Sequence, residues 1–232
     1  MSDAAPGVPD AIVDGRPPAR GLRWWAVLLV VIAVAGAAFA VGRFSAFGTS
    51  PAVPGDGSPE AGFARDMQVH HTQAIEMAMT IYRKTEDEGV RTLSFDIATA
   101  QAGQRGEFFA WLVQWGLPQA STAPLMQWMV GHPAHSHGGA GEQPTDRELR
   151  DEMGMATPEQ LAELDAATGT PADCLFLDLM IRHHQGAIPM AQALVDLGDD
   201  PRAVQVAGGI IQTQGAEIDL MRSLQTTLGC EG

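Results

Sequence analysis

A pair of adjacent histidines occurs twice in this chain of 232 residues, each time within the same surrounding pattern. Residues 63–78 are FARDMQVHHTQAIEMA and residues 176–191 are FLDLMIRHHQGAIPMA, so eight of 16 positions are identical at an offset of 113 residues. The offset also holds in the segments that follow, where Gln101 corresponds to Gln214. An internal repeat restricts the fold, because each copy can bury its apolar surface against the other.

Apolar residues recur with helical spacing in each repeat and in the segment after it, so the repeated unit is predicted to be a helical hairpin. Ser58-Pro59 and Asp200-Pro201 are typical helix starts, because a capping side chain precedes a proline at the first helical position. We expect an all-α protein in which the two hairpins form a four-helix bundle. The expected helices span about residues 59–84, 90–115, 171–197 and 201–229.

An insert at 117–156 separates the two hairpins and is rich in Gly, Pro, His and Met. We expect it to be irregular as far as Thr157, where a Thr-Pro-Glu-Gln capping box begins a short helix. Because the hairpins flank the insert, deletion of residues 119–155 is expected to leave them folded.

The insert also carries a candidate loop metal site, because short His-rich tracts often bind metal. The candidate ligands are Met126, Met129, His132, His135 and His137. The alternative is a solvated loop in which Met126 and Trp128 only cap the bundle.

The N-terminal region contains an uncharged run of 19 residues, 24–42. As a helix it would be about 28 Å long, close to the ~30 Å hydrocarbon core of a bilayer. Arginines before the run predict a cytoplasmic tail at 1–23, a single membrane crossing, and, beyond a flexible linker at 43–57, an extracytoplasmic domain at 58–232. The alternative is a secreted protein cleaved near Ala40.

Each histidine pair and its flanking methionines share one face of the predicted helix. The members are Met67, His70, His71 and Met77 in the first repeat, and Met180, His183, His184 and Met190 in the second. Facing stripes would gather imidazoles and thioethers, a ligand set that favours Cu(I) and tolerates Cu(II). Methionine is not a usual zinc ligand. Gln101 and Gln214, on the companion helices, are candidates to hydrogen-bond the imidazole N–H groups.

Other functions remain as alternatives. The histidine pairs can instead be hydrogen-bonding groups of a structural or interaction domain, with methionine as core filler. A copper-dependent oxidoreductase is another alternative, although an enzyme is not the favoured interpretation. A di-iron site is disfavoured because no Glu-x-x-His occurs, and the net charge of −14 disfavours a nucleic-acid partner.

Two runs, GMATPEQLAEL and FLDLMIRHHQGAIPMA, resemble the exported bacterial domain of unknown function family 305, and the resemblance covers residues 62–229. It implies a ferritin-like four-helix bundle and, for some members, copper handling outside the cytoplasm. Together with the His–Met stripe, it favours an extracytoplasmic copper-binding protein for storage, buffering or delivery. The expected partners are the copper ion, the membrane and an unidentified copper-handling protein.

The chain has two cysteines, Cys174 and Cys230, and neither lies in a Cys-x-x-Cys motif. Cys174 follows the start of one predicted helix, and Cys230 follows the end of the next. An antiparallel hairpin brings these ends together, and an oxidising exterior permits the bond, so we predict a disulfide. The alternative is two free thiols that join the copper ligands.

Overall fold

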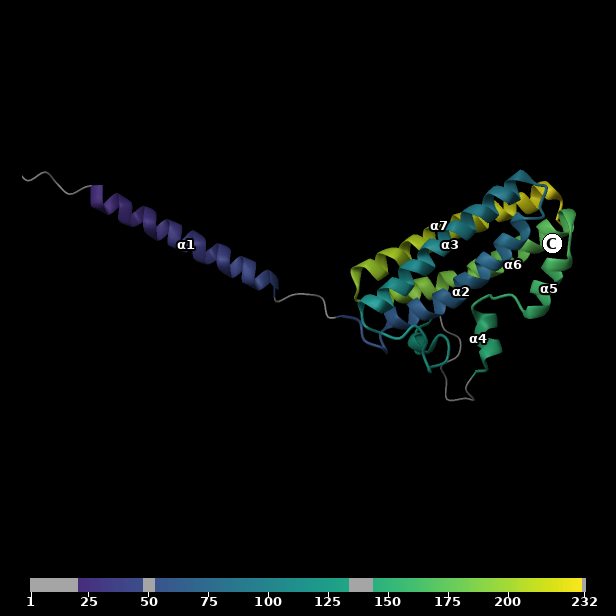
Figure 1. Ribbon diagram of the computed structural model, residues 1–232, viewed down its shortest axis with the longest axis horizontal. Helices are drawn as coiled ribbons and strands as arrows, with labels where there is room; N and C mark the ends of the chain where they lie inside the picture. The colour runs from purple at the N-terminus through teal and green to yellow at the C-terminus, as the bar shows by residue number, and fades with distance from the viewer. Residues whose placement is uncertain (1–20, 48–52, 134–143, 231–232) are drawn as a thin grey trace, which may run out of the picture. The chain divides into compact units, whose positions relative to one another are not determined.

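The computed structural model describes residues 21–47, 53–133 and 144–230. These residues form seven α-helices and one short 3-10 helix, and no strand occurs among them (Figure 1). The all-α prediction is therefore confirmed, while the finer ferritin-like description stays a prediction. The chain divides into two compact units, Met1–Ala52 and Val53–Gly232.

The first unit contains one helix, α1 (Gly21–Phe47). Its segment Trp24–Arg43 has a mean hydropathy of 2.5 and is long and apolar enough to cross a membrane. A signal sequence has the same length and composition, so both interpretations fit this helix. This confirms the predicted apolar helix. Most of the predicted cytoplasmic tail, residues 1–20, lies outside the described residues.

The second unit is built around two long helical hairpins (Figure 1). The first consists of α2 (Pro59–Tyr82) and α3 (Glu88–Gln114), and the second of α6 (Gly169–Leu197) and α7 (Pro201–Leu228). The helices of each hairpin pack together, and the hairpins meet along α2 and α6, which run in opposite directions.

Capping side chains explain where three of the four long helices begin, whereas Thr168, the N-cap residue of α6, makes no side-chain cap hydrogen bond. Ser58 accepts a hydrogen bond from the backbone N–H of the first turn of α2, and Asp87 and Asp200 do the same for α3 and α7. Gly229 ends α7 with φ at 71°, a backbone conformation that glycine adopts without strain. These caps agree with the predicted starts at residues 58 and 200.

The insert contains the 3-10 helix η1 (Gln127–Met129) and the helix α4 (Asp146–Glu152), and α5 (Pro158–Ala166) follows it. The capping box at Thr157 begins α5, as predicted. The prediction of an irregular insert is wrong for α4, where Thr145 and Glu148 form a second capping box. This Thr-x-x-Glu signal is visible in the sequence.

A polar layer divides the core into two apolar clusters. All four long helices pass from one cluster to the other at this layer. The layer consists of His70, His71, Gln101, His183, His184 and Gln214, each of which is buried. The repeat therefore places equivalent polar residues at the same level of both hairpins.

Side chains of the insert belong to the core. Met126, Met129 and Met153 are fully buried in the apolar cluster formed with the N-terminal half of α2. The carboxylate of Asp66 on α2 accepts hydrogen bonds from the Met126 backbone N–H at 2.8 Å and from Trp128 Nε1–H at 2.9 Å. Deletion of residues 119–155 would open this cluster, so we now expect it to destabilise the hairpins, and the outcome stays a prediction.

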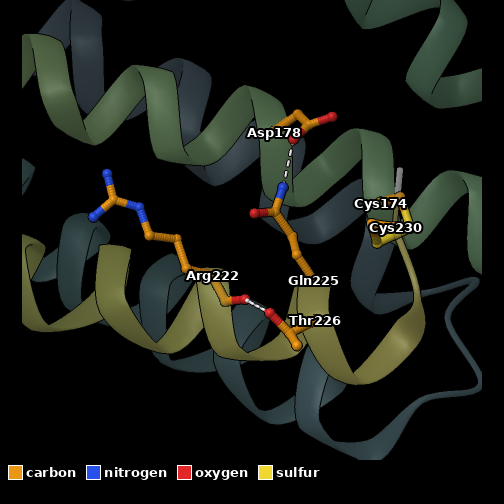
Figure 2. The surroundings of a disulfide bond; sticks show 6 residues. All are labelled: Cys174, Asp178, Arg222, Gln225, Thr226 and Cys230. Atoms are coloured by element: carbon orange, nitrogen blue, oxygen red, sulfur yellow. Dashed lines mark hydrogen bonds between the residues drawn. A yellow bond between two sulfur atoms is a disulfide. The ribbon is translucent and has the colours of Figure 1, made fainter. Parts of the chain in front are cut away.

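Cys174 and Cys230 form the predicted disulfide, with their Cα atoms 5.5 Å apart. Figure 2 shows the bond joining Cys174, near the start of α6, to Cys230, two residues beyond the end of α7. Close by, Gln225 on α7 donates a hydrogen bond to Asp178 on α6. The alternative of two free thiols is excluded, because no cysteine is free.

Candidate functional site

The two histidine pairs lie at the contact between α2 and α6, and all four side chains are fully buried. His70 and His183 stack on each other, with ring centroids 3.6 Å apart and an angle of 31° between the ring planes. We call these two the inner histidines. His71 and His184, the outer histidines, have ring centroids 6.1 and 6.3 Å from those of their inner neighbours.

The Nε2 atom of each inner histidine is hydrogen-bonded to a backbone carbonyl. His183 Nε2 lies 3.1 Å from the His70 carbonyl oxygen, which ties α6 to α2. His70 Nε2 lies 3.0 Å from the carbonyl oxygen of Met153 in the insert. The two contacts are not symmetric, because the insert occupies one side of the pair only.

Each outer histidine is hydrogen-bonded to the companion helix of its own hairpin. His71 Nε2 lies 2.8 Å from Gln104 Oε1 on α3, and His184 Nε2 lies 2.7 Å from Glu217 Oε2 on α7. Gln101 and Gln214 were the predicted partners, and this prediction is wrong by one helical turn. Their buried amides have no hydrogen-bond partner in the described part of the chain. The signal for the observed partners is the constant spacing of 33 residues from each outer histidine.

These partners fix the tautomer of all four rings. A carbonyl, an amide oxygen and a carboxylate only accept, so each Nε2 must carry the hydrogen. In a neutral imidazole the other nitrogen then has a free lone pair. Within the described residues, no Nδ1 atom of the four histidines has a hydrogen-bond partner. Four buried lone pairs are therefore held in fixed rings, which is how histidine ligands of metals are usually oriented.

Burial also keeps three of the rings neutral, those of His70, His71 and His183. It lowers the pKa of His70 to about 4 and the pKa of His71 to about 3. Burial is likewise the main reason why the pKa of His183 lies well below its ordinary value, and the neighbouring histidines add to the effect. A neutral imidazole is the form that binds a metal ion.

The four methionines of the predicted stripes are all fully buried, on both sides of the polar layer. Met67 and Met190 belong to the apolar cluster on one side, and Met77 and Met180 to the cluster on the other. The stripes therefore face each other across the hairpin contact as the repeat predicts, with one thioether from each repeat on each side.

A short segment of the insert covers this site. A Cβ atom at Gly186 on α6 would lie 1.9 Å from the Met153 carbonyl oxygen, so only glycine permits the contact. The side-chain amide of Gln73 on α2 accepts a hydrogen bond from the Ala156 N–H and donates one to the Ala156 carbonyl. Residues 153–156, which we call the strap, are thus fastened to both repeats. The strap was not predicted from the sequence, although the glycine at 186, where the first repeat has Gln73, is a signal for it.

The structure describes three of the five members of the candidate loop site. Met126 and Met129 are buried in the core, as in the alternative in which the loop caps the bundle. His132 Nε2 lies 3.1 Å from Asp196 Oδ2 on α6. His135 and His137 lie outside the described residues.

The histidine pairs supply imidazole nitrogens, and the methionines of the adjoining apolar clusters supply thioether sulfurs. Among the described residues, no group of three or more His, Cys, Asp or Glu side chains is arranged to hold a metal ion. A metal held here would therefore need thioether ligands as well as imidazole Nδ1 atoms. Such a mixed, soft ligand set suits copper, and Cu(I) in particular.

Comparison with known proteins agrees with this architecture. Residues 60–225 match the sequence profile described as Domain of unknown function (DUF305), whereas no significant match is found among curated proteins. A solved DUF305 protein from Streptomyces coelicolor is 37% identical, with a TM-score of 0.66, and the match covers 76% of this chain and 98% of that one.

Two further structures are similar. A DUF305 fragment from Deinococcus radiodurans is 30% identical, with a TM-score of 0.58 and coverage of 74% and 95%. CopM, solved in a Cu(II)-bound form, is 26% identical, with a TM-score of 0.55 and coverage of 73% and 97%. The family profile covers most of the chain, and the chain therefore belongs to the DUF305 family.

Proposed function

We propose that this protein binds copper outside the cytoplasm, as Cu(I) in preference to Cu(II), for storage, buffering or delivery. The observation that carries the proposal is the set of four buried Nδ1 lone pairs without a partner in the described residues. Four buried thioethers lie on either side of them. The Cu(II)-bound structure of CopM, a protein of similar fold, supports copper as the metal, and the preference for Cu(I) rests on the thioethers alone.

The site residues in this proposal are the eight members of the two stripes. The imidazoles would bind through Nδ1, because each Nε2–H is already used as a donor. The thioethers would complete the coordination and favour the lower oxidation state. A second, weaker site on His132, His135 and His137 remains a prediction.

We also propose that α1 is a single-pass membrane anchor with its N-terminus in the cytoplasm. The support is the apolar segment Trp24–Arg43, preceded by several arginines. Cleavage near Ala40 would instead release the domain. Mass measurement of the mature protein separates these outcomes, because a retained anchor includes residues 1–40.

The test of copper binding is a competition titration of the full chain in detergent against a chromophoric Cu(I) chelator. A variant with Met67, Met77, Met180 and Met190 all changed to leucine keeps the core volume nearly constant. Loss of a group that only hydrogen-bonds a metal ligand lowers metal affinity by about 10- to 100-fold. Loss of the four thioethers, which would bind the metal directly, should lower the Cu(I) affinity by more than that. The matched variant M126L/M129L, which changes two other buried methionines, should bind like the wild type.

A second candidate function is a structural or interaction domain. The favouring observation is that His183 and His70 each link two segments through Nε2–H. In that case the wild type would take up no copper.

Two results of the titration would contradict the proposed ligands. Equal Cu(I) affinity in the wild type and the four-methionine variant would exclude the thioethers, and loss of affinity in M126L/M129L would move the site to the insert. Turnover of a reductant by the copper-loaded chain would favour the oxidoreductase alternative.

A further inference from the structure

The two repeats place different groups behind their outer histidines. His71 Nε2–H donates to the neutral amide of Gln104, whereas His184 Nε2–H donates to the carboxylate of Glu217. Both partners lie 33 residues after their histidine, and the two distances are 2.8 and 2.7 Å. The repeat is therefore symmetric in geometry at these positions but not in charge.

Neighbouring residues increase the difference in charge. Arg105 follows Gln104 on α3, and its Nη1 lies 3.3 Å from the hydroxyl of Thr72, the residue after His71. The position in the second repeat that corresponds to Arg105 is the apolar Ile218. A guanidinium thus lies beside the first outer histidine, and a carboxylate supports the second.

The surroundings of Glu217 make its charge effective. His184 is fully buried, and the side chain of Glu217 is 16% exposed. Charges interact more strongly where water is largely excluded. A metal ion on Nδ1 withdraws electron density from the ring and makes Nε2–H a stronger donor, so a carboxylate acceptor increases the basicity of the ligand. An amide does so less, and a nearby guanidinium opposes it.

We propose that Glu217 makes His184 the first of the four core histidines to be loaded with copper. The hairpin α6–α7 is then the higher-affinity half of the site, and α2–α3 is the lower-affinity half. Glu217 acts as a positioning residue that touches the ligand and not the metal. This inference rests on the proposed copper function and adds the order in which the two halves are loaded.

The test uses the full chain in detergent, with Cu(I) as the probe under anaerobic, reducing conditions. Glu217→Gln keeps an acceptor oxygen for Nε2–H and removes the charge. The affinity for the first Cu(I) should fall by about 10- to 100-fold in competition titrations. Asp219→Asn removes the same charge from an exposed position on the same helix, and it should leave the affinity unchanged.

A charge-transfer variant distinguishes this role from a merely structural one. Gln104→Glu combined with Glu217→Gln moves the carboxylate to the other hairpin. With less than one equivalent of Cu(I), the imidazole ¹⁵N signal that moves first should be Nδ1 of His184 in the wild type. In the combined variant it should be Nδ1 of His71.

Failure of this inference is distinguishable from failure of the proposed function. If the wild type binds no Cu(I), the copper function itself is wrong. If the wild type binds Cu(I) and E217Q has the same affinity, the function stands and the role of Glu217 is overturned. A first response at His71 in the wild type would overturn it as well.

Discussion

Each core imidazole uses one ring nitrogen as a donor and keeps the other as a buried acceptor. A buried polar group without a partner costs about 1–3 kcal/mol, and the polar layer contains four such nitrogens in the described residues. The amides of Gln101 and Gln214 add to the cost. A typical domain is stable by only about 5–15 kcal/mol, so apolar residues would serve a purely structural role better. The cost is accounted for if the lone pairs bind a ligand.

The lowered histidine pKa values make the stability of the metal-free protein depend on pH. The pKa of unfolded histidine is 6.5, and that of His70 in the folded protein is about 4. Between these values the unfolded chain binds a proton that the folded chain does not, so acidification favours unfolding. Each such histidine contributes about 1.4 kcal/mol per pH unit. Asp66 has the opposite effect below about pH 6. Burial raises its pKa to about 6, so the folded chain there binds a proton that the unfolded chain does not, and this offsets the effect of one histidine.

The expected result is a lower free energy of unfolding at pH 5 than at pH 6.5. Chemical denaturation of the metal-free full chain at several pH values measures it. The three histidines with lowered pKa values, His70, His71 and His183, outweigh the two carboxylates whose pKa values burial raises, Asp66 and Asp173. Equal or greater stability at pH 5 would show that the rings are not buried in the neutral form.

The strap joins the insert to both repeats and lies against the inner histidines. It is held by the hydrogen bond from His70 to the Met153 carbonyl, by the two bonds of Gln73, and by the close approach at Gly186. Gly154, with φ at 70°, allows the turn that brings the strap against α6. These contacts make the insert a part of the site and not a separate loop.

Gly186→Ala should disturb the strap directly. The new Cβ atom would overlap backbone atoms of Met153 and Gly154, which cannot move without breaking the bond to His70. We expect a loss of about 1–3 kcal/mol in the free energy of unfolding, as for other overpacked sites. The control is Gly208→Ala on α7, where a Cβ meets no atom within 4 Å.

The control should be neutral or stabilising by up to about 1 kcal/mol, because alanine is the better helix former. Chemical denaturation of both variants makes the comparison. Similar stabilities for G186A and G208A would mean that the strap is not packed on α6 as described.

At the scale of the whole molecule, the disulfide fixes the second hairpin at the end remote from its turn. Changing Cys174 and Cys230 to alanine removes a cross-link over 56 residues. The free energy of unfolding should fall by about 4 kcal/mol in the chain-entropy model. Thermal unfolding with and without reductant checks this, since reductant should lower the melting temperature of the wild type only. A wild type insensitive to complete reduction would contradict the expected role of the bond.

The repeated hairpins and the disulfide could be predicted from the sequence, whereas the strap and the partners of the outer histidines could not. The repeat and the capping signals at Ser58 and Asp200 predict the hairpins and the level of the histidine pairs. The strap depends on a close contact at Gly186, which periodicity does not indicate. The partners Gln104 and Glu217 lie one turn beyond the matching pair Gln101 and Gln214. They were not predicted, because a helical pattern indicates which face a residue lies on but not how far its side chain reaches.

The central claim is that copper binds to the Nδ1 atoms of the buried histidine pairs. Imidazole ¹⁵N spectra of the full chain, recorded without metal and after loading with Cu(I), test it most directly. We predict that Nδ1 signals of core histidines move on loading while their Nε2 atoms keep their protons, as the bonds to Met153, Gln104, His70 and Glu217 require. Unchanged core Nδ1 signals in a copper-loaded protein, with shifts confined to the histidines of the insert, would contradict the account.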